Sequence, residues 1–171
     1  MRWNTLVIAA ALVAAGSTAG FAGKAAYSPE DILKFFSSQE ATRGICVGTE
    51  QECGFADKKP AGFNLRLNFE KDSAALNDEA KTNLDAFAAA LKSPSLSVAT
   101  FAIEGYTDAS GSDGHNKDLS DRRAEAVVAY LSQLGVDGSK LKAVGYGEAK
   151  PVGDDPLDPA NRRVETRLVI Q

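Results

Sequence analysis

Apolar residues recur along the chain with two periods, one of two residues and one of three to four. The segment from Phe63 to Phe69 alternates apolar and polar residues, which predicts a strand with one buried face. After Asn77, a residue type that caps helix N-termini, the period becomes that of a helix, which ends at Ser93-Pro94-Ser95. The residues expected on the inner face of this helix are Ala80, Leu84, Phe87, Ala88 and Leu91.

The same periods predict three further strands and one further helix, separated by polar loops. In chain order these elements are a strand over 98–106, a Gly-, Ser- and Asp-rich loop over 107–115, a helix from Asn116 that stops at Gly135, a strand over 142–146, an acidic loop over 151–158 and a strand over 164–170. Strands and helices alternate twice before two strands close the chain. We therefore expect an α/β two-layer sandwich, a mixed sheet with helices on one face.

One basic residue interrupts the apolar stripe of the second helix. Arg123 lies four residues after Leu119 and four before Val127, so the three side chains share one face. A guanidinium stays protonated and is costly to bury alone, so a carboxylate of the protein or of a ligand should meet it. Asp108, in the loop before the helix, is the expected protein partner. The alternatives are a purely structural ion pair or an Arg whose charged end reaches water.

The first residues have the pattern of an export signal. A charged start, an unbroken apolar stretch from Leu6 to Ala15 and small residues through Ala22 predict a signal peptide over 1–22. About ten apolar residues are too few to span a bilayer. Cleavage is expected after Ala22, with Ala19 as the alternative. No cysteine follows the apolar stretch, so a lipid anchor there is not expected.

A short extension over 23–60 is expected to precede the main domain, which covers 61–171. Ser28 and Pro29 predict a helix start, because a hydroxyl caps the helix and proline suits its first position. An extension of this size cannot bury enough surface alone and should pack on the main domain. The expected apolar edge of this helix consists of Ile32, Phe35 and Phe36.

The only two cysteines lie in the extension. Cys46 and Cys53 close a short loop, which predicts a disulfide in an exported chain. Zinc is the alternative, but two thiols and one distant histidine lack the ligand number of a structural zinc site. No metal site is therefore expected.

Composition and charge limit the partners. The 171 residues, 44% hydrophobic and 25% charged, suit one compact domain. The net charge of −4 becomes −5 without the leader, since removing Arg2 leaves 18 basic and 23 acidic residues. Because the basic residues are also dispersed, nucleic acid is excluded as a partner.

Catalytic and cofactor motifs fit the residues poorly. His115 lies near Ser110, Ser112, Asp108 and Asp113, but proximity in a flexible loop is not a triad, which needs a nucleophile held against an oriented base. The nucleophile motif Gly-x-Ser-x-Gly is also missing. A calcium loop starting at Asp108 lacks Gly at its sixth position and Glu at its twelfth. Gly145-Tyr-Gly147 lacks the third glycine of a nucleotide-binding loop. We therefore expect no catalytic residue, no cofactor and no enzyme activity.

Five short motifs in the second half of the chain occur in the order and with the spacing of a known family. They are Gly105-Tyr-Thr-Asp108-Ala-Ser-Gly111, Asn116, Leu119-Ser120 with Arg122-Arg123-Ala124, Gly145-Tyr-Gly147 with Pro151, and Asn161-Arg-Arg-Val-Glu165.

Together these motifs resemble the OmpA-like C-terminal domain, which OmpA porins, the peptidoglycan-associated lipoprotein and flagellar stator proteins share. The resemblance covers roughly Phe63 to Gln171. It implies non-covalent peptidoglycan binding in the periplasm, or at the outer membrane, through the diaminopimelate of the stem peptide. In that family the aspartate binds the ammonium of diaminopimelate and the helix arginine its carboxylate, which implies these roles for Asp108 and Arg123. An Asp and an Arg facing one pocket suit a zwitterionic ligand.

The resemblance implies further ligand-binding residues with less definite roles. Thr107, Asn116 and Leu119 are expected to flank the pocket. The end of the first strand, from Asn68 to Asp72, is expected to line its rim. Asn161 and Arg162 or Arg163 belong to the closing motif, where a structural role is equally open.

Two residues depart from the family pattern, and one other function stays open. Tyr106 stands where the family often has His, and His115 where an aromatic residue often precedes Asn116, so the shape of the pocket should differ. The alternative function is a protein-interaction module in an envelope complex, with a reassigned pocket and a partner on the N-terminal extension. Exposed Phe35 and Phe36 would favour it.

Overall fold

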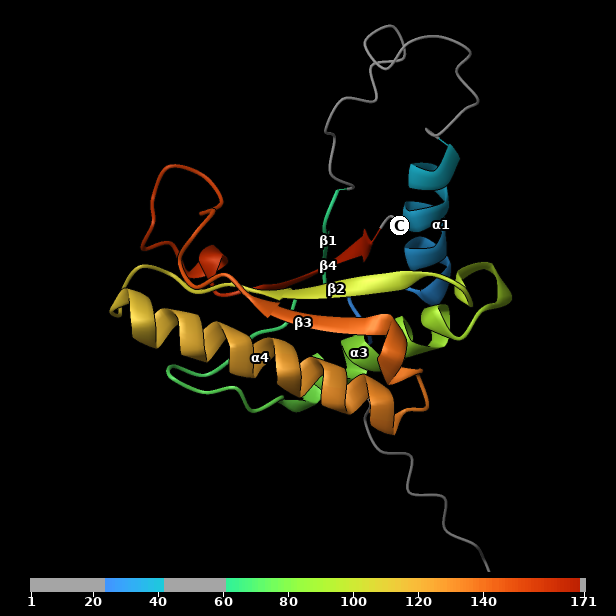
Figure 1. The fold of residues 1–171 in the computed structure, drawn as a ribbon, viewed down its shortest axis with the longest axis horizontal. Helices are drawn as coiled ribbons and strands as arrows, with labels where there is room; N and C mark the ends of the chain where they lie inside the picture. The colour runs from blue at the N-terminus through green and yellow to red at the C-terminus, as the bar shows by residue number, and fades with distance from the viewer. Residues whose placement is uncertain (1–23, 42–60, 170–171) are drawn as a thin grey trace, which may run out of the picture.

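A four-stranded mixed sheet forms the centre of the computed structural model, which describes residues 24–41 and 61–169 (Figure 1). The strands are β1 (Phe63–Asn64), β2 (Thr100–Gly105), β3 (Leu141–Gly145) and β4 (Val164–Val169). They lie in the order β1-β4-β2-β3; β2 and β3 are parallel, whereas β4 is antiparallel to both β1 and β2. The predicted mixed sheet is confirmed. The predicted signal peptide and the Cys46–Cys53 disulfide lie outside the described residues.

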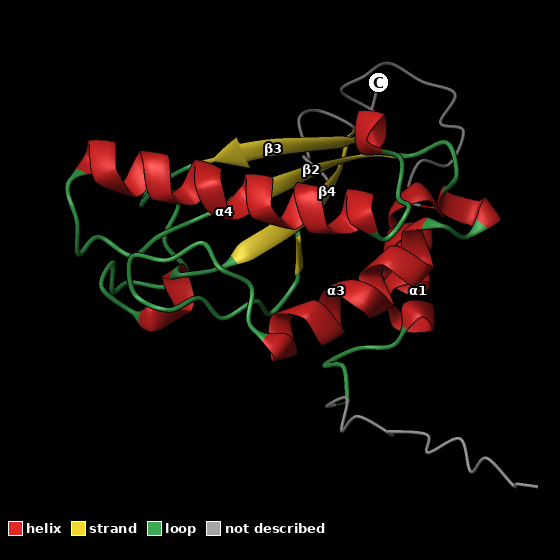
Figure 2. Ribbon diagram, turned by 90° about the horizontal axis from the view of Figure 1, so that it is seen from below, coloured by secondary structure: helices red, strands yellow, loops and turns green. Residues whose placement is uncertain are grey.

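Helices α3 (Asp78–Leu91) and α4 (Asp113–Gln133) cover one face of this sheet (Figure 2). The side chain of Asn77 caps α3 by accepting a hydrogen bond from the Ala80 amide at 2.8 Å. All five predicted inner-face residues of α3 are buried, as its apolar period requires. Helix α4 begins three residues before the predicted start, because Ser112 caps it. No helix in the described ranges is long and apolar enough to cross a membrane.

Helix α1 (Pro29–Ala41) stands at the end of the sheet where β2 begins and packs against α3 (Figure 1). The Phe36 ring is fully buried, with its centroid 5.1 Å from that of Phe101 on β2. The Phe87 ring of α3 packs on Phe101 from a second direction, at 6.4 Å. The described part of the predicted extension is therefore part of the core, and Phe36 offers no docking surface.

The first strand is shorter than its apolar alternation predicts. Phe63 and Asn64 pair with β4 and the Leu65 amide donates to the Val164 carbonyl at 3.0 Å, but the pairing ends there because the chain turns at Arg66, whose φ is +49°. The Asn64 side chain stabilises this turn by accepting a hydrogen bond from the Arg66 amide at 2.8 Å. Leu67 and Phe69 are still buried, in alternation with exposed residues. The apolar alternation therefore predicted which side chains are buried, but it did not predict where strand pairing ends. The chain leaves the sheet here and passes over α4.

Two glycines allow α4 to lie directly on the sheet. A Cβ atom at Gly105 would overlap the backbone carbonyl of Ser120, and one at Gly145 would overlap the Asp121 amide. The close approach is held by hydrogen bonds from the Gly145 amide to Asp121 Oδ1, at 2.7 Å, and from the Gly147 amide to Ser120 Oγ, at 2.8 Å. The N-terminal half of α4 is thereby fixed beside the end of β2.

Candidate functional site

A cavity of about 720 Å³ lies where the loop after β1, the loop after β2 and the N-terminal half of α4 meet. We call it the α4 cavity. Six of the sequence-predicted ligand residues line it, and each is buried except Arg162, which is partly exposed. These six are Thr107, Asp108, Asn116, Leu119, Arg123 and Arg162.

Asp108 lies in the loop after β2, three residues beyond the end of the strand, and is 6% exposed. Its Oδ2 atom accepts a hydrogen bond from Arg162 Nη1 at 2.7 Å, and its Oδ1 atom accepts from the amide and the hydroxyl of Ser110. Burial would raise the pKa of the Asp108 carboxyl, but the hydrogen bonds from Ser110 and Arg162 outweigh it and hold this pKa below its usual range. Asp108 is therefore ionised and paired with Arg162.

Arg123 lies in the α4 stripe as predicted and is 1% exposed, but the expected ion pair with Asp108 is not formed. Its Nε atom donates to the Ser73 carbonyl at 3.0 Å, and its Nη2 atom donates to the Glu70 carbonyl at 3.3 Å. The guanidinium also lies over the Phe69 ring, 4.9 Å from the centroid. The loop after β1, which leaves the sheet at Arg66, provides all three contacts.

Among the described residues, the Arg123 guanidinium has neither a full set of hydrogen bonds nor an ion-pair partner. Its Nη1 atom is buried without a partner, and no carboxylate within 24–41 or 61–169 forms an ion pair with it. Burial, followed by the charge of Arg162, lowers the pKa of the Arg123 guanidinium, while Asp108 and Asp72 partly raise it. A guanidinium stays charged even so, and the cavity therefore holds a buried cation that can bind an anion.

Three more predicted residues shape the cavity wall. Thr107 follows β2, and its buried Oγ1 atom has no hydrogen-bond partner in the part of the chain that the structure describes, so it is available to bond a ligand. The Asn116 side chain donates from Nδ2 to Glu148 Oε2 at 2.6 Å, which ties the first turn of α4 to the loop after β3. Leu119 contributes apolar surface next to these polar groups.

Two predicted ligand residues are not brought into the cavity. Asn68 is exposed and does not line it. Asn161 is 1% exposed and bonds the acidic loop instead, accepting from the Val152 amide at 2.6 Å and donating to the Asp155 carbonyl at 3.0 Å. That loop reaches the cavity wall through the Ala109 amide, which donates to the Pro156 carbonyl at 3.0 Å. Asn161 therefore supports the wall from behind.

At the rim of the cavity lies Asp72, from the segment predicted to line it, together with Ser110, His115 and Leu157, which the sequence analysis did not place there. His115 Nε2 lies 3.0 Å from Asp72 Oδ1, which joins the start of α4 to the loop after β1. Leu157, which is 57% exposed, adds an apolar edge from the acidic loop. Ser110 could have been found from the Asp-x-Ser spacing, in which an Asp side chain bonds a backbone amide two residues later. His115 and Leu157 lie at the rim because of contacts between segments that are distant in the sequence.

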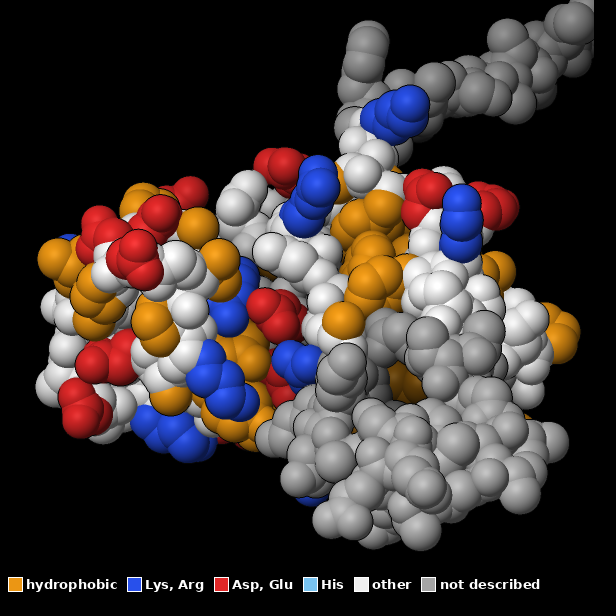
Figure 3. Space-filling view, turned by 90° about the horizontal axis from the view of Figure 1, so that it is seen from above, with side chains coloured by type: hydrophobic (Ala, Val, Ile, Leu, Met, Phe, Trp, Pro, Cys, Tyr) orange, Lys and Arg blue, Asp and Glu red, His pale blue; other side chains and the backbone are white. Residues whose placement is uncertain are grey.

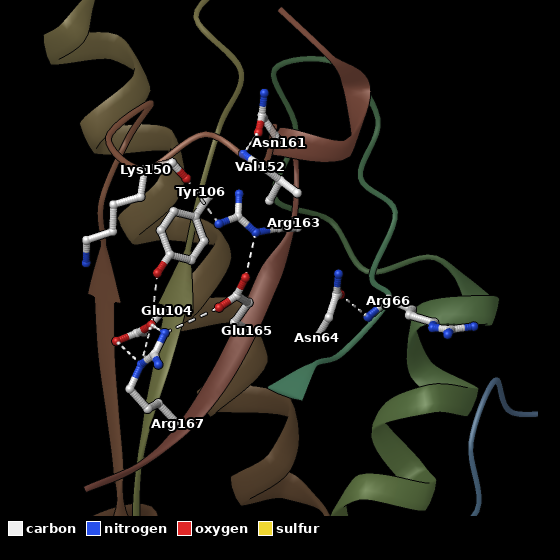
Figure 4. Close-up of polar contacts among 10 residues, drawn as sticks. All are labelled: Asn64, Arg66, Glu104, Tyr106, Lys150, Val152, Asn161, Arg163, Glu165 and Arg167. Atoms are coloured by element: carbon white, nitrogen blue, oxygen red, sulfur yellow. Dashed lines mark hydrogen bonds and ion pairs between the residues drawn. The ribbon is translucent and has the colours of Figure 1, made fainter. Parts of the chain in front are cut away.

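The opposite face of the sheet carries a second polar group, which we call the open-face cluster: Glu104, Tyr106, Arg163, Glu165 and Arg167 (Figure 4). Tyr106 donates its hydroxyl to Glu104 Oε2 at 2.9 Å, and Arg163 Nε donates to Glu165 Oε1 at 2.7 Å. The Arg163 guanidinium lies 3.9 Å from the centre of the Tyr106 ring. Of the adjacent pair Arg162 and Arg163, only Arg162 therefore lines the α4 cavity, and Tyr106 does not shape it.

The charges on this side of the molecule are mixed. Figure 3 shows acidic and basic side chains next to each other in the hollow between the acidic loop and the N-terminal helix. No large area of a single sign is visible among the described residues of this face.

Residues 68–165, more than half of the chain, match the model of the OmpA family. This chain belongs to the OmpA family. The resemblance found in its motifs is thereby confirmed. The matched segment contains every residue of the α4 cavity.

Two characterised relatives and one solved structure illustrate the similarity. The chain is 44% identical over 102 residues to the peptidoglycan-associated lipoprotein of Pseudomonas putida, covering 58% of this chain and 60% of that protein. It is 37% identical over 109 residues to outer membrane porin F of Pseudomonas aeruginosa, covering 61% of this chain and 30% of the porin. The peptidoglycan-associated lipoprotein structure from Burkholderia pseudomallei has a TM-score of 0.52 and 36% identity, covering 61% of this chain and 88% of that one. The matched region thus spans less than two thirds of both characterised relatives.

Proposed function

We propose that this OmpA-family chain binds peptidoglycan non-covalently in the cell envelope, with the diaminopimelate of the stem peptide in the α4 cavity. The observation that carries the proposal is the buried Arg123 guanidinium, which lines the cavity and has no counter-charge within the described residues. Such a group is costly to keep unless an anion meets it. A ligand carboxylate would supply that anion and bond the unpartnered Nη1 atom.

Asp108 would receive the ammonium of the same ligand. Its carboxylate is ionised and lines the cavity, and each carboxylate oxygen has more than one acceptor site, so the bonds to Arg162 and Ser110 do not exhaust it. An amino acid carries its ammonium and carboxylate on one carbon atom, so an anionic and a cationic side chain in one cavity suit it. The unpartnered Thr107 hydroxyl is available as a further hydrogen-bonding group.

The relatives support the envelope setting of this proposal. Two of the proteins compared are peptidoglycan-associated lipoproteins by name, and a third is an outer membrane porin. We therefore propose that the protein tethers or organises envelope components from the periplasm and does so without catalysis. The predicted signal peptide over 1–22 and the disulfide between Cys46 and Cys53 are part of the same proposal.

Co-sedimentation with insoluble peptidoglycan tests the proposal directly. The mature protein should pellet with peptidoglycan that contains diaminopimelate, and soluble diaminopimelate should compete it away. Arg123→Ala should lose pelleting, whereas the control Arg122→Ala should keep it, because Arg122 is exposed, bonds Asp118 and lies outside the cavity. Circular dichroism should show that both variants are folded.

Failure of the folded wild-type protein to pellet would overturn the proposal. The alternative, a protein-interaction module with a reassigned cavity, would then gain weight, and a search for partners of the N-terminal extension would follow.

A further inference from the structure

The charges inside the α4 cavity are unequal in a way that the motif could not reveal. Asp108 and Arg162 form an ion pair at 2.7 Å and neutralise each other. Arg123 is more deeply buried than either and has only backbone carbonyls as partners among the described residues. The buried charge that the protein leaves uncompensated is therefore positive.

We propose that the α4 cavity selects its ligand by the carboxylate and not by the ammonium, and that Arg162 sets this preference by pairing with Asp108. The inference rests on the proposed function, since it assumes that the ligand is an amino acid such as diaminopimelate. Arg162 would then be a specificity-determining residue in addition to Asp108 and Arg123.

The two ends of the ligand meet different costs. A carboxylate that approaches Arg123 bonds the unpartnered Nη1 atom and displaces no protein side chain. An ammonium that approaches Asp108 must share a carboxylate whose charge Arg162 already neutralises, and whose other oxygen holds Ser110. It also meets two guanidinium groups, Arg123 and Arg162, which repel it. The other charged residues of the lining, Glu70, Lys71 and Asp72, are exposed, so water screens their charges more strongly than it screens the buried Arg123.

This arrangement predicts an order among simple ligands of similar length. Pimelate, which has both carboxylates of diaminopimelate and neither ammonium, should bind. Cadaverine, which has two ammonium groups and no carboxylate, should not. Pimelamide, in which both carboxylates are replaced by neutral amides of nearly the same shape, should fail as well, because it leaves the Arg123 charge unmet.

The test is competition of these four compounds against pelleting of the wild-type mature protein with peptidoglycan. Pimelate should compete at a concentration at least tenfold lower than either cadaverine or pimelamide, and diaminopimelate should compete as well. Equal potency of pimelate and cadaverine, or of pimelate and pimelamide, would overturn the inference.

Variants of Arg162 test its assigned role. In the wild type, cadaverine should need a much higher competing concentration than pimelate. Arg162→Gln should reduce the ratio of these two concentrations at least fivefold, because the Asp108 charge is then no longer neutralised. Arg162→Lys should keep the wild-type ratio, and so should the control Arg122→Gln. An unchanged ratio in folded Arg162→Gln would contradict the role of Arg162.

The outcomes separate this inference from the function it rests on. If diaminopimelate competes but pimelate and cadaverine are equal, the cavity binds the wall and only the carboxylate preference is wrong. If diaminopimelate itself does not compete, the proposed function and this inference both fail.

Discussion

Two arginines on opposite faces of the sheet have nearly the same local setting and different partners. Arg123 and Arg163 are both buried, both lie over an aromatic ring and both have an Nη1 atom without a hydrogen bond. Arg163 has a carboxylate partner, Glu165, at 2.7 Å, whereas Arg123 has only backbone carbonyls within the described chain. An Nη1 atom without a hydrogen bond is therefore not enough to separate a candidate binding site from a structural ion pair. The two arginines differ instead in their ion-pair partner: Arg123, which lines a cavity, has none among the described residues.

The burial of each cation also has a different cause. Arg163 belongs to the open-face cluster, whose two glutamates and two arginines compensate one another across β2 and β4 (Figure 4). Arg123 is covered by the loop after β1, which leaves the sheet at Arg66 and contacts the guanidinium with two carbonyl oxygens and the Phe69 ring but with no carboxylate in an ion pair. Arg163 has a carboxylate in an ion pair, whereas Arg123 has none among the described residues, and it is there that we propose a ligand anion binds.

The largest expected effect is on wall binding by Arg123→Ala. Loss of one partner of a buried, charge-assisted contact should weaken binding by about 2 to 5 kcal/mol, a factor of roughly thirty or more. The stability should change by less than about 1.5 kcal/mol, because two carbonyls lose a bond beside a cavity that water can enter. Pelleting isotherms and urea unfolding measure the two quantities. Global unfolding of the variant would identify Arg123 as a structural residue like Arg163.

Arg163→Ala should show the reverse pattern. Breaking its pair leaves Glu165 with the longer contact to Arg167, at 3.4 Å, so the free energy of unfolding should fall by about 2 to 3 kcal/mol. Wall binding by the folded fraction should stay within about twofold of the wild type. A loss of binding without a loss of stability would mean that the open-face cluster also contacts the ligand.

Asp108 adds an acid-dependent term on the cavity side. Its pKa is lowered in the folded protein by hydrogen bonds from Ser110 and Arg162, which outweigh burial, so its ionised form stabilises the fold. This stability is complete above the unfolded carboxyl pKa of about 3.9 and is lost as the pH falls through the lower folded value. Asp108→Asn should lower the free energy of unfolding by about 1 kcal/mol at pH 7. The effect is this small because Arg162 is partly exposed and water screens the ion pair. The difference from the wild type should shrink on acidification below pH 4, which chemical denaturation at a series of pH values measures. A difference that is constant with pH would exclude the ion pair as its source.

The smallest effect is expected at the rim. His115 and Asp72 form an exposed pair, so His115→Gln should change stability by less than about 0.5 kcal/mol and binding by less than about threefold. Thermal melts and the pelleting assay at neutral pH measure these changes. A tenfold loss of binding would show that the rim orders the loop over Arg123.

The sequence determined those features that depend on neighbours along the chain. The helical period of α3 identified its buried face, since residues three and four apart must share a side. Asn77 marked its start, since a capping side chain reaches an amide three residues away. The position of Arg123 in the apolar stripe likewise fixed its burial before any partner was known.

The tertiary structure decided which distant groups meet. Asp108 pairs with Arg162, 54 residues further along the chain, and not with Arg123. The acidic loop places Arg162 at the cavity, and the loop after β1 bonds the Arg123 guanidinium with its backbone carbonyls. The early end of β1 has the same origin: apolar alternation records which side chains are buried, but the positive φ of Arg66 ends the pairing. A periodic pattern constrains each element singly, whereas charge compensation between segments depends on distances that exist only in the folded chain.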